Sequence, residues 1–222
     1  MGAVVQLTAD DGHVFNAYRA APDGEPRAGL VLVQEIFGVN DHIRGVCDDY
    51  AAQGYLVLAP CLFDRKEAGI ELGYSAETVD EGRALKADIG WEGPVMDIKA
   101  GVDALEGAPK VVVVGYCWGG SLAWLAACRL EIDVAIGYYG GQIIEFVGET
   151  PACPTMLHFG TEDAGIPMAD VDEIKTTHPD VTVHVYQGAG HGFNCDQRAD
   201  HHPEAAALAR DRSLAHLARY IG

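Results

Sequence analysis

The sequence predicts an α/β fold with a mainly parallel sheet and helices on both faces. Three observations support this prediction: short apolar runs recur along the chain, helical segments lie between them, and glycines stand where several of those segments end. A short, continuous apolar run is typical of a strand that is covered on both faces. Alternation of such strands with helices favours a parallel sheet.

The N-terminal part of the chain predicts an antiparallel hairpin. Two short strands, at residues 4–8 and 14–19, flank Asp11-Gly12. This dipeptide suits the positive φ angles of a tight turn. A Pro/Gly-rich break at residues 22–26 then separates the hairpin from the rest of the chain.

The remaining elements follow from the alternation of apolar and helical segments. Buried strands are expected at residues 29–34, 55–59, 110–114, 134–139 and 155–159, and a last, alternating strand at 181–187. Helices are expected at residues 41–53, 95–105, 118–130 and 203–221. Repetition of strand, helix and strand implies a parallel sheet with helices on both faces.

Length and composition indicate one globular domain, residues 1–222. A chain of 222 residues buries roughly 70% of its extended surface on folding. Hydrophobic residues make up 49% of the chain and charged residues 22%, as in ordinary globular proteins. No internal repeat or low-complexity linker indicates a second domain.

The net charge of −18 argues against nucleic-acid and membrane partners. It arises from 33 acidic and 15 basic residues, and it repels phosphate backbones and anionic lipid. Because the acidic residues are spread along the chain, we interpret them as a solvated surface. Adaptation to a high-salt habitat is the alternative.

The chain carries no pattern of export or membrane insertion. Its first residues lack a basic segment and an apolar core, and no apolar run approaches the roughly 18 residues of a membrane span. Six cysteines without a Cys-x-x-Cys pair predict reduced thiols. We therefore expect a cytoplasmic protein, and the sequence leaves open whether it is a monomer or a small homo-oligomer.

The strongest chemical signal is Gly115-Tyr116-Cys117-Trp118-Gly119-Gly120, which lies between a predicted strand and a predicted helix. It has the pattern Gly-x-nucleophile-x-Gly with cysteine as the nucleophile. Glycines allow a sharp turn that exposes the central side chain, and the helix N-terminus favours a thiolate and an oxyanion. The alternative is a buried structural cysteine in a glycine-rich turn.

A thiol nucleophile needs a base, and His191 is the best candidate. It lies between Gly190 and Gly192 in the loop after the last predicted strand, where glycines allow a close approach to other loops. His158 lies inside an apolar strand and is expected to be a satisfied core or edge histidine. We expect three other histidines at the surface: His13, His178 and His216. A metal site at His201 and His202, with Asp200, is an alternative that lacks a third ligand at a recognisable spacing.

Two carboxylates stand at the ends of predicted strands. Asp163 lies in the loop after the strand at residues 155–159, so nucleophile, acid and base follow in the order that this fold uses. Glu162 and Asp170 are competing acids, and a solvated surface role for Asp163 is the alternative. Glu35 directly follows the strand at residues 29–34, and either a functional or a solvated side chain is compatible with that position.

Four segments together resemble the dienelactone hydrolase family. They are Gln-Glu-Ile-Phe-Gly-Val-Asn at 34–40, Gly-Tyr-Cys-Trp-Gly-Gly at 115–120, Gly-Tyr-Tyr-Gly at 137–140 and Ala-Gly-His-Gly-Phe at 189–193. The similarity runs over nearly the whole chain. It implies the α/β-hydrolase fold, with a mainly parallel sheet and helices on both faces.

The resemblance also implies a mechanism. Cys117, His191 and Asp163 match the family's triad, and Glu35 matches a catalytic glutamate that holds the resting thiol and helps to generate the thiolate when substrate arrives. The oxyanion hole would be formed by the backbone N–H groups of Ile36 and Trp118. The reaction needs no cofactor and no metal.

Family members hydrolyse dienelactone, a cyclic enol ester with a carboxylate, and use two arginines to bind that carboxylate. Arg83 is the candidate counterpart of one arginine, and Tyr139 is the second candidate substrate-binding residue. Cys195 stands where the other arginine is expected, and Arg198, just beyond it, is the candidate substitute for that arginine. The alternatives are a thiol esterase or thioesterase with a different substrate, and a catalytically silent binding protein of the same fold.

Overall fold

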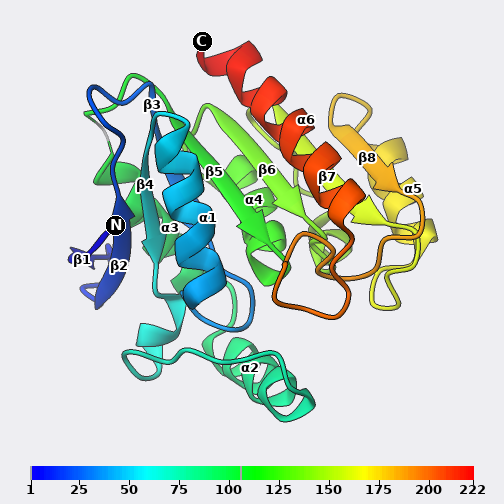
Figure 1. The fold of residues 1–222 in the computed structure, drawn as a ribbon, viewed down its shortest axis with the longest axis horizontal. Coiled ribbons are helices and arrows are strands. Elements are labelled where there is room, and N and C mark those ends of the chain that lie inside the picture. The colour runs from blue at the N-terminus through cyan, green and yellow to red at the C-terminus, as the bar shows by residue number, and fades with distance from the viewer. Residues whose placement is uncertain (1, 106) are drawn as a thin grey trace. The chain divides into compact units, whose positions relative to one another are not determined.

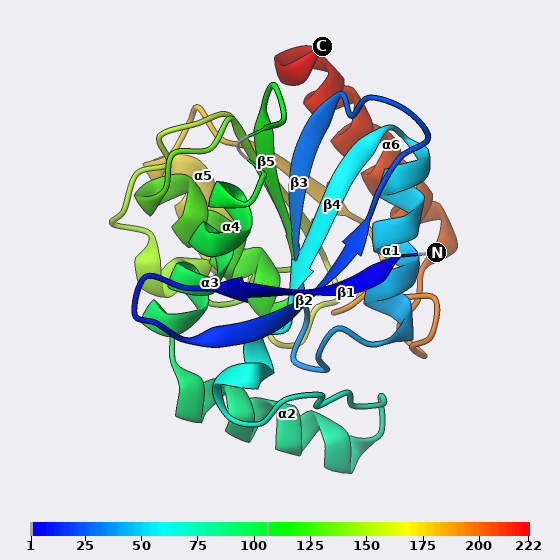
Figure 2. The same ribbon diagram turned by 90° about the vertical axis from the view of Figure 1, so that its left-hand side faces the viewer.

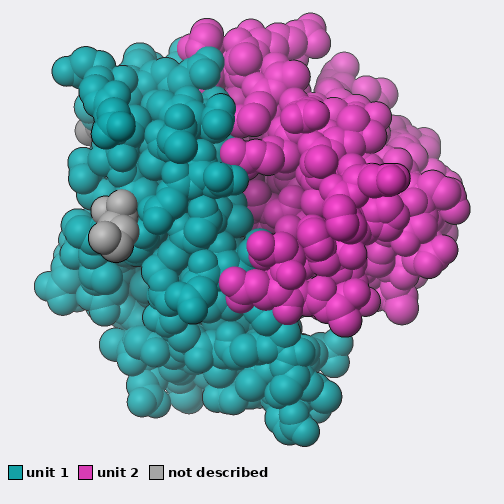
Figure 3. Space-filling model, in the orientation of Figure 1, with its two compact units in different colours: residues 1–113 teal, residues 114–222 magenta. Residues whose placement is uncertain are grey.

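The computed structural model describes residues 2–105 and 107–222. The chain divides after Val113 into two compact units, called unit 1 and unit 2 below and coloured teal and magenta in Figure 3. The division falls within strand β5 (Val111–Tyr116), which begins in unit 1 and ends in unit 2. The expectation of one domain stays a prediction.

Unit 1 begins with the expected hairpin. Strands β1 (Ala3–Thr8) and β2 (Val14–Ala20) are antiparallel, and Gly12 adopts a φ of 83° in the turn between them. β2 pairs antiparallel with β4 (Tyr55–Pro60), which pairs in parallel with β3 (Ala28–Val33). The strand order is β1-β2-β4-β3, with the start of β5 beside β3. Every residue of β3 is buried, as expected for a strand covered on both faces.

Two helices of unit 1 cover opposite faces of its strands, α1 (Asp41–Ala52) and α3 (Glu92–Asp103) (Figures 1 and 2). The Asn40 side chain accepts the Ile43 N–H at 3.2 Å and so caps the start of α1. The other elements are the short 3-10 helix η1 (Leu62–Arg65) and α2 (Ala76–Ile89), which the sequence analysis did not predict.

In unit 2 the strand order is β5-β6-β7-β8, and β7 (Thr155–Gly160) pairs in parallel with both β6 (Val134–Tyr138) and β8 (Thr182–Tyr186). Helices α4 (Trp118–Arg129) and α6 (Pro203–Ile221) lie on opposite faces of these strands (Figure 1). The unit also contains η2 (Ile143–Phe146) and α5 (Met168–Thr177), and α5 was not predicted. The predicted α/β fold with mainly parallel strands and helices on both faces is confirmed.

His158 is a satisfied core histidine, as predicted. Its Nδ1 lies 2.7 Å from the Tyr186 hydroxyl and its Nε2 lies 3.0 Å from Ser213 Oγ, which is 2.7 Å from the Tyr138 hydroxyl. Burial lowers the pKa of His158 well below its ordinary value, and nearby positive groups lower it further, among them Arg212. The neutral ring therefore links β6, β7 and β8 to α6.

The surface assignment of two other histidines is wrong. His178 is buried, donates from Nε2 to the Val147 carbonyl at 2.7 Å, and meets the Trp124 ring edge-on. His216 is also buried, on the face of α6 that packs inward. His13 is only partly exposed.

No helix among residues 2–105 and 107–222 combines the length and the hydropathy that crossing a bilayer requires.

Candidate active site

Cys117 occupies the sharp turn between β5 and α4. It adopts φ 55° and ψ −115°, a backbone conformation that residues other than glycine rarely adopt. Its N–H donates to the Tyr138 carbonyl at 2.9 Å, and its own carbonyl accepts the Gly120 N–H at 2.9 Å. The turn is therefore held from both sides while the thiol stays partly exposed.

The glycines of the motif are required by close contacts. A Cβ atom at Gly115 would lie 1.9 Å from the Gly119 carbonyl oxygen, and one at Gly120 would lie 2.4 Å from the Tyr138 carbonyl oxygen. Both distances are far shorter than any van der Waals contact. The predicted strand, turn and helix are thus present, and Cys117 is partly rather than fully buried.

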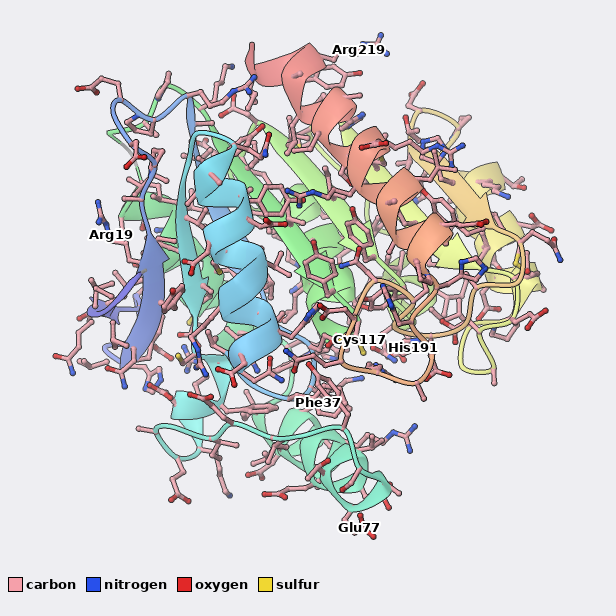
Figure 4. All side chains as sticks on the ribbon, viewed as in Figure 1. Arg19, Phe37, Glu77, Cys117, His191 and Arg219 are labelled. Carbon is pink, nitrogen blue, oxygen red and sulfur yellow. The ribbon has the colours of Figure 1, made fainter. Side chains whose placement is uncertain are left out.

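Cys117, His191 and Asp163 form a continuous hydrogen-bonded line within unit 2. His191 Nε2 lies 3.1 Å from Cys117 Sγ, and His191 Nδ1 donates to Asp163 Oδ2 at 2.7 Å. The Gly165 N–H donates to the other Asp163 oxygen at 2.8 Å. Figure 4 shows Cys117 and His191 side by side. This is the geometry of a nucleophile, a base and an acid that orients the base.

The electrostatics of this line favour a protonated imidazole. Burial by itself lowers the pKa of His191, but negative charge on Cys117 and the hydrogen-bonded Asp163 carboxylate outweigh it and raise the pKa to about 10. His191 can therefore accept the thiol proton and hold it at neutral pH.

Burial disfavours the thiolate form of four other cysteines. Burial raises the pKa of Cys61 and of Cys128 to about 12 and that of Cys153 to about 11, and it raises the pKa of Cys47 further still. Such thiols are poor nucleophiles at neutral pH. Within the part of the chain that the structure describes, no disulfide joins the six cysteines.

The acids that compete with Asp163 are Glu162, in the same loop, and Asp170, in helix α5. Asp163 is buried at 6% exposure, so the alternative of a solvated surface residue is wrong. Glu162 is exposed, and Asp170 lies in the first turn of α5. His202, part of the metal alternative, accepts the Ala205 N–H on Nδ1 at 3.3 Å and caps the start of α6.

Two candidate substrate-binding residues of unit 2 lie beside His191. Tyr139 has a φ of 38°, and its ring centroid is 5.2 Å from that of His191. A Cβ at Gly192 would lie 2.5 Å from a terminal nitrogen of Arg198, so this guanidinium lies against the histidine loop. Arg198 also pairs with Asp200 at 3.6 Å.

Arg83 and Glu35 belong to unit 1. Arg83 is an exposed residue of α2, with an ion pair to Asp80 at 3.6 Å. Glu35 follows β3 and is completely buried, which decides against the solvated alternative. The neighbouring Gln34 side chain accepts the Leu62 N–H at 3.1 Å and donates to the Glu35 carbonyl at 3.2 Å, so it fixes the backbone at this position.

Sequence reasoning missed several groups that contact the segments carrying Cys117, Asp163 and His191. They include the Tyr138 carbonyl, the Gly165 N–H, and the Thr161 hydroxyl, which accepts the Gly188 N–H at 2.9 Å. The glycines around these positions were the available signal, because each one permits a close backbone approach.

Over most of its length the chain is similar to known proteins of one family. A sequence model of the dienelactone hydrolase family matches residues 15–221. Carboxymethylenebutenolidase of Pseudomonas putida is 34% identical over 230 residues, covering 96% of this chain and 95% of the relative. Carboxymethylenebutenolidase 1 of Cupriavidus pinatubonensis is 30% identical, with 96% and 95% covered.

Solved structures show the same relationship. A crystal structure from Klebsiella pneumoniae, provisionally named a dienelactone hydrolase, superposes with a TM-score of 0.84 at 28% identity, covering 98% of this chain and 100% of that one. The family match extends over almost all of the chain and includes every residue of the line from Cys117 to Asp163. The chain therefore belongs to the dienelactone hydrolase family.

Proposed function

We propose that this chain hydrolyses a small ester or lactone through an acyl-enzyme on Cys117. The observation that carries the proposal is the line of contacts from Cys117 Sγ to His191 at 3.1 Å and from His191 to Asp163 at 2.7 Å. Membership of a family of ester and lactone hydrolases supports the reaction class. His191 acts as the base, and Asp163 orients its ring.

The reaction proceeds in two halves. The Cys117 thiol transfers its proton to His191 Nε2, and the thiolate sulfur attacks the substrate carbonyl to form a tetrahedral oxyanion. Collapse of this intermediate breaks the ester C–O bond and leaves the acyl group on sulfur. The leaving oxygen departs as an enolate or alkoxide that takes up the proton held by His191, so the histidine is neutral again.

Deacylation uses the same residues. Neutral His191 removes a proton from water, the resulting hydroxide attacks the thioester, and the carboxylic acid is released as the thiol is restored. Asp163 keeps Nδ1 protonated, so Nε2 faces the reacting atoms in both halves.

The roles of three other groups follow from the family resemblance and stay predictions. Trp118 is the first residue of α4, where backbone N–H groups point out of the helix, and we propose its N–H as one oxyanion donor. We propose the Ile36 N–H as the other donor and the buried Glu35 carboxylate as the group that assists thiolate formation. Glu35→Gln should fold normally and lose much of its rate.

A carboxylate-bearing lactone of the dienelactone type is the first substrate to test, because relatives at 30–34% identity are named carboxymethylenebutenolidases. Arg198 and Tyr139 are the proposed substrate contacts beside His191, and Arg83 is a third candidate. We also propose a cytoplasmic protein, a monomer or small homo-oligomer, that uses neither cofactor nor metal.

Hydrolysis of dienelactone, a neutral lactone, an aryl ester and an acyl thioester by the purified protein tests this function. Turnover of any of these by the wild type, lost in Cys117→Ala and retained in the control Cys153→Ala, is the expected result. Turnover of the thioester alone would favour the thioesterase alternative. No turnover of any substrate would favour the silent binding protein.

A further inference from the structure

The loops that carry Asp163 and His191 are joined by backbone hydrogen bonds beyond the strands β7 and β8. The Thr161 N–H donates to the Tyr186 carbonyl at 3.0 Å, and the Glu162 N–H donates to the Ala189 carbonyl at 2.9 Å. These bonds continue the β7–β8 pairing past Gly160 and Tyr186, where the strands themselves end. The two loops therefore leave the sheet in a fixed register.

Thr161 makes a second contact in this register through its side chain. Its hydroxyl oxygen accepts the Gly188 N–H at 2.9 Å, while its own N–H is bound by Tyr186. Gly188 adopts a φ of 77°, so the chain reverses direction at the residue that this hydroxyl binds. One residue of the acid loop thus holds both the end of β8 and the turn that begins the histidine loop.

The position of this contact relates it to the triad. Asp163 lies two residues after Thr161, and His191 lies three residues after Gly188. The segments 161–163 and 188–191 are therefore joined at one end by the Thr161 hydroxyl and at the other by the 2.7 Å contact between Asp163 and His191. A histidine loop released at Gly188 would keep the backbone bonds of Ala189 to Glu162 and to Tyr186, the latter at 3.4 Å, but it would lose its side-chain bond to Thr161. Small shifts of this kind lengthen a hydrogen bond without unfolding the loop.

We propose that Thr161 is a positioning residue of the triad, whose hydroxyl holds the histidine loop so that His191 Nδ1 faces Asp163. The inference rests on the proposed function, because it assigns a role relative to that triad. Thr161 touches neither His191 nor Cys117 in any contact described above, and it acts through the backbone of the loop.

Two substitutions separate the hydroxyl from the shape of the side chain. Thr161→Val keeps the branched, half-buried side chain and removes the acceptor, whereas Thr161→Ser keeps the acceptor and removes a methyl group. Thr176→Val is the matched control, because it removes the Thr176 hydroxyl bond to the Asp172 carbonyl on α5, away from both loops. Should Thr161→Val fail to fold, Thr161→Ala tests the same loss.

Thr161→Val is expected to lower kcat roughly 10- to 100-fold with little change in KM, as for a misplacement of catalytic groups by a fraction of an ångström to 1 Å. Thr161→Ser and Thr176→Val should keep wild-type kcat. NMR titration gives an independent readout: the pKa of His191 should fall in Thr161→Val, because the Asp163 carboxylate stabilises the protonated ring less. A purely structural role would lower the unfolding temperature and leave the titration of His191 unchanged.

Wild-type kcat and an unchanged His191 titration in Thr161→Val would overturn the proposal, and so would an equal loss in Thr161→Ser. These outcomes are separable from failure of the proposed function. If Cys117→Ala kept full turnover, the nucleophile would be wrong, while the His191 titration would still report whether Thr161 positions its ring against Asp163.

Discussion

Gly160 is a residue at which a single methyl group should disturb the catalytic geometry measurably. It ends β7, and a Cβ atom at this position would lie 2.1 Å from the Ala189 carbonyl oxygen and 2.7 Å from the carbonyl carbon. Real Cβ atoms essentially never approach closer than 3.0 Å, so the histidine loop must move by about 0.9 Å in Gly160→Ala. Both contacted atoms belong to the backbone, so no side chain can rotate away to relieve the contact.

A displacement of this size has two expected consequences. Misplacement of His191 by about 1 Å should lower kcat about 100-fold. The crowded contact should also lower the free energy of unfolding by about 1–3 kcal/mol. Initial rates on an aryl ester measure the first effect, and urea unfolding measures the second.

The matched control is Gly148→Ala. A Cβ at Gly148 meets nothing within 4 Å, and its φ is not positive, so this variant should keep the kcat and the stability of the wild type. Gly160→Ala with wild-type kcat and stability would show that the two loops do not approach as described. Loss of stability without loss of kcat would show that the loop can move without displacing His191.

Three further predictions concern reactivity, acid stability and specificity. Iodoacetamide at neutral pH should modify Cys117 first, since burial raises the pKa of most other thiols, and peptide mapping that finds Cys61 or Cys153 labelled earlier would contradict this. Because the folded-state pKa of buried His158 is lowered, the unfolded chain takes up a proton that the folded chain does not as pH falls below about 6.5. His158 should then lower the free energy of unfolding by up to about 1.4 kcal/mol for each unit by which the pH falls. His158→Gln should lack this contribution, and an equal dependence on pH in the wild type and in His158→Gln would refute the reasoning. Arg198→Met should lower kcat/KM for a carboxylate-bearing lactone roughly 10- to 100-fold more than for a neutral lactone of similar size, and equal losses would exclude Arg198 as the carboxylate contact.

The parts of the fold with strong local signals could be predicted from the sequence. The valines that begin β5 and the glycines at 115, 119 and 120 fix the strand, the turn and the start of α4. His191 could be assigned because glycines flank it, and Asp163 because it follows β7. Each assignment combines a buried strand with a turn that only certain residues allow.

Helices α2 and α5 were missed because they lack a wide apolar face. Gly82 is the one buried residue within α2, and its missing Cβ leaves room for the Ile36 carbonyl, since a Cβ there would lie 2.1 Å from that oxygen. The cap at Ser75, which accepts the Thr78 N–H at 3.4 Å, was the available signal. α5 has ten residues, of which Val171 and Ile174 are buried, too few for a clear helical period.

The errors on histidines have a related cause. The buried residues of α6 are Ala205, Ala209, Ser213, His216 and Leu217. Except for the adjacent last pair, they are three or four positions apart in the sequence. This spacing places His216 on the inward face, and histidine as a residue type has an intermediate tendency to be buried. Residue type was given more weight than helical position, and position decides burial here.

The central claim is that Cys117 carries the acyl group during hydrolysis, and rapid acid quench with p-nitrophenyl acetate tests it most directly. Wild-type protein stopped within the first turnover should carry one acetyl group on the peptide that contains Cys117, and Cys117→Ala should carry none and release no p-nitrophenol above background. Release of p-nitrophenol in the first turnover with Cys117 unmodified, or with the acetyl group on another residue, would contradict the account.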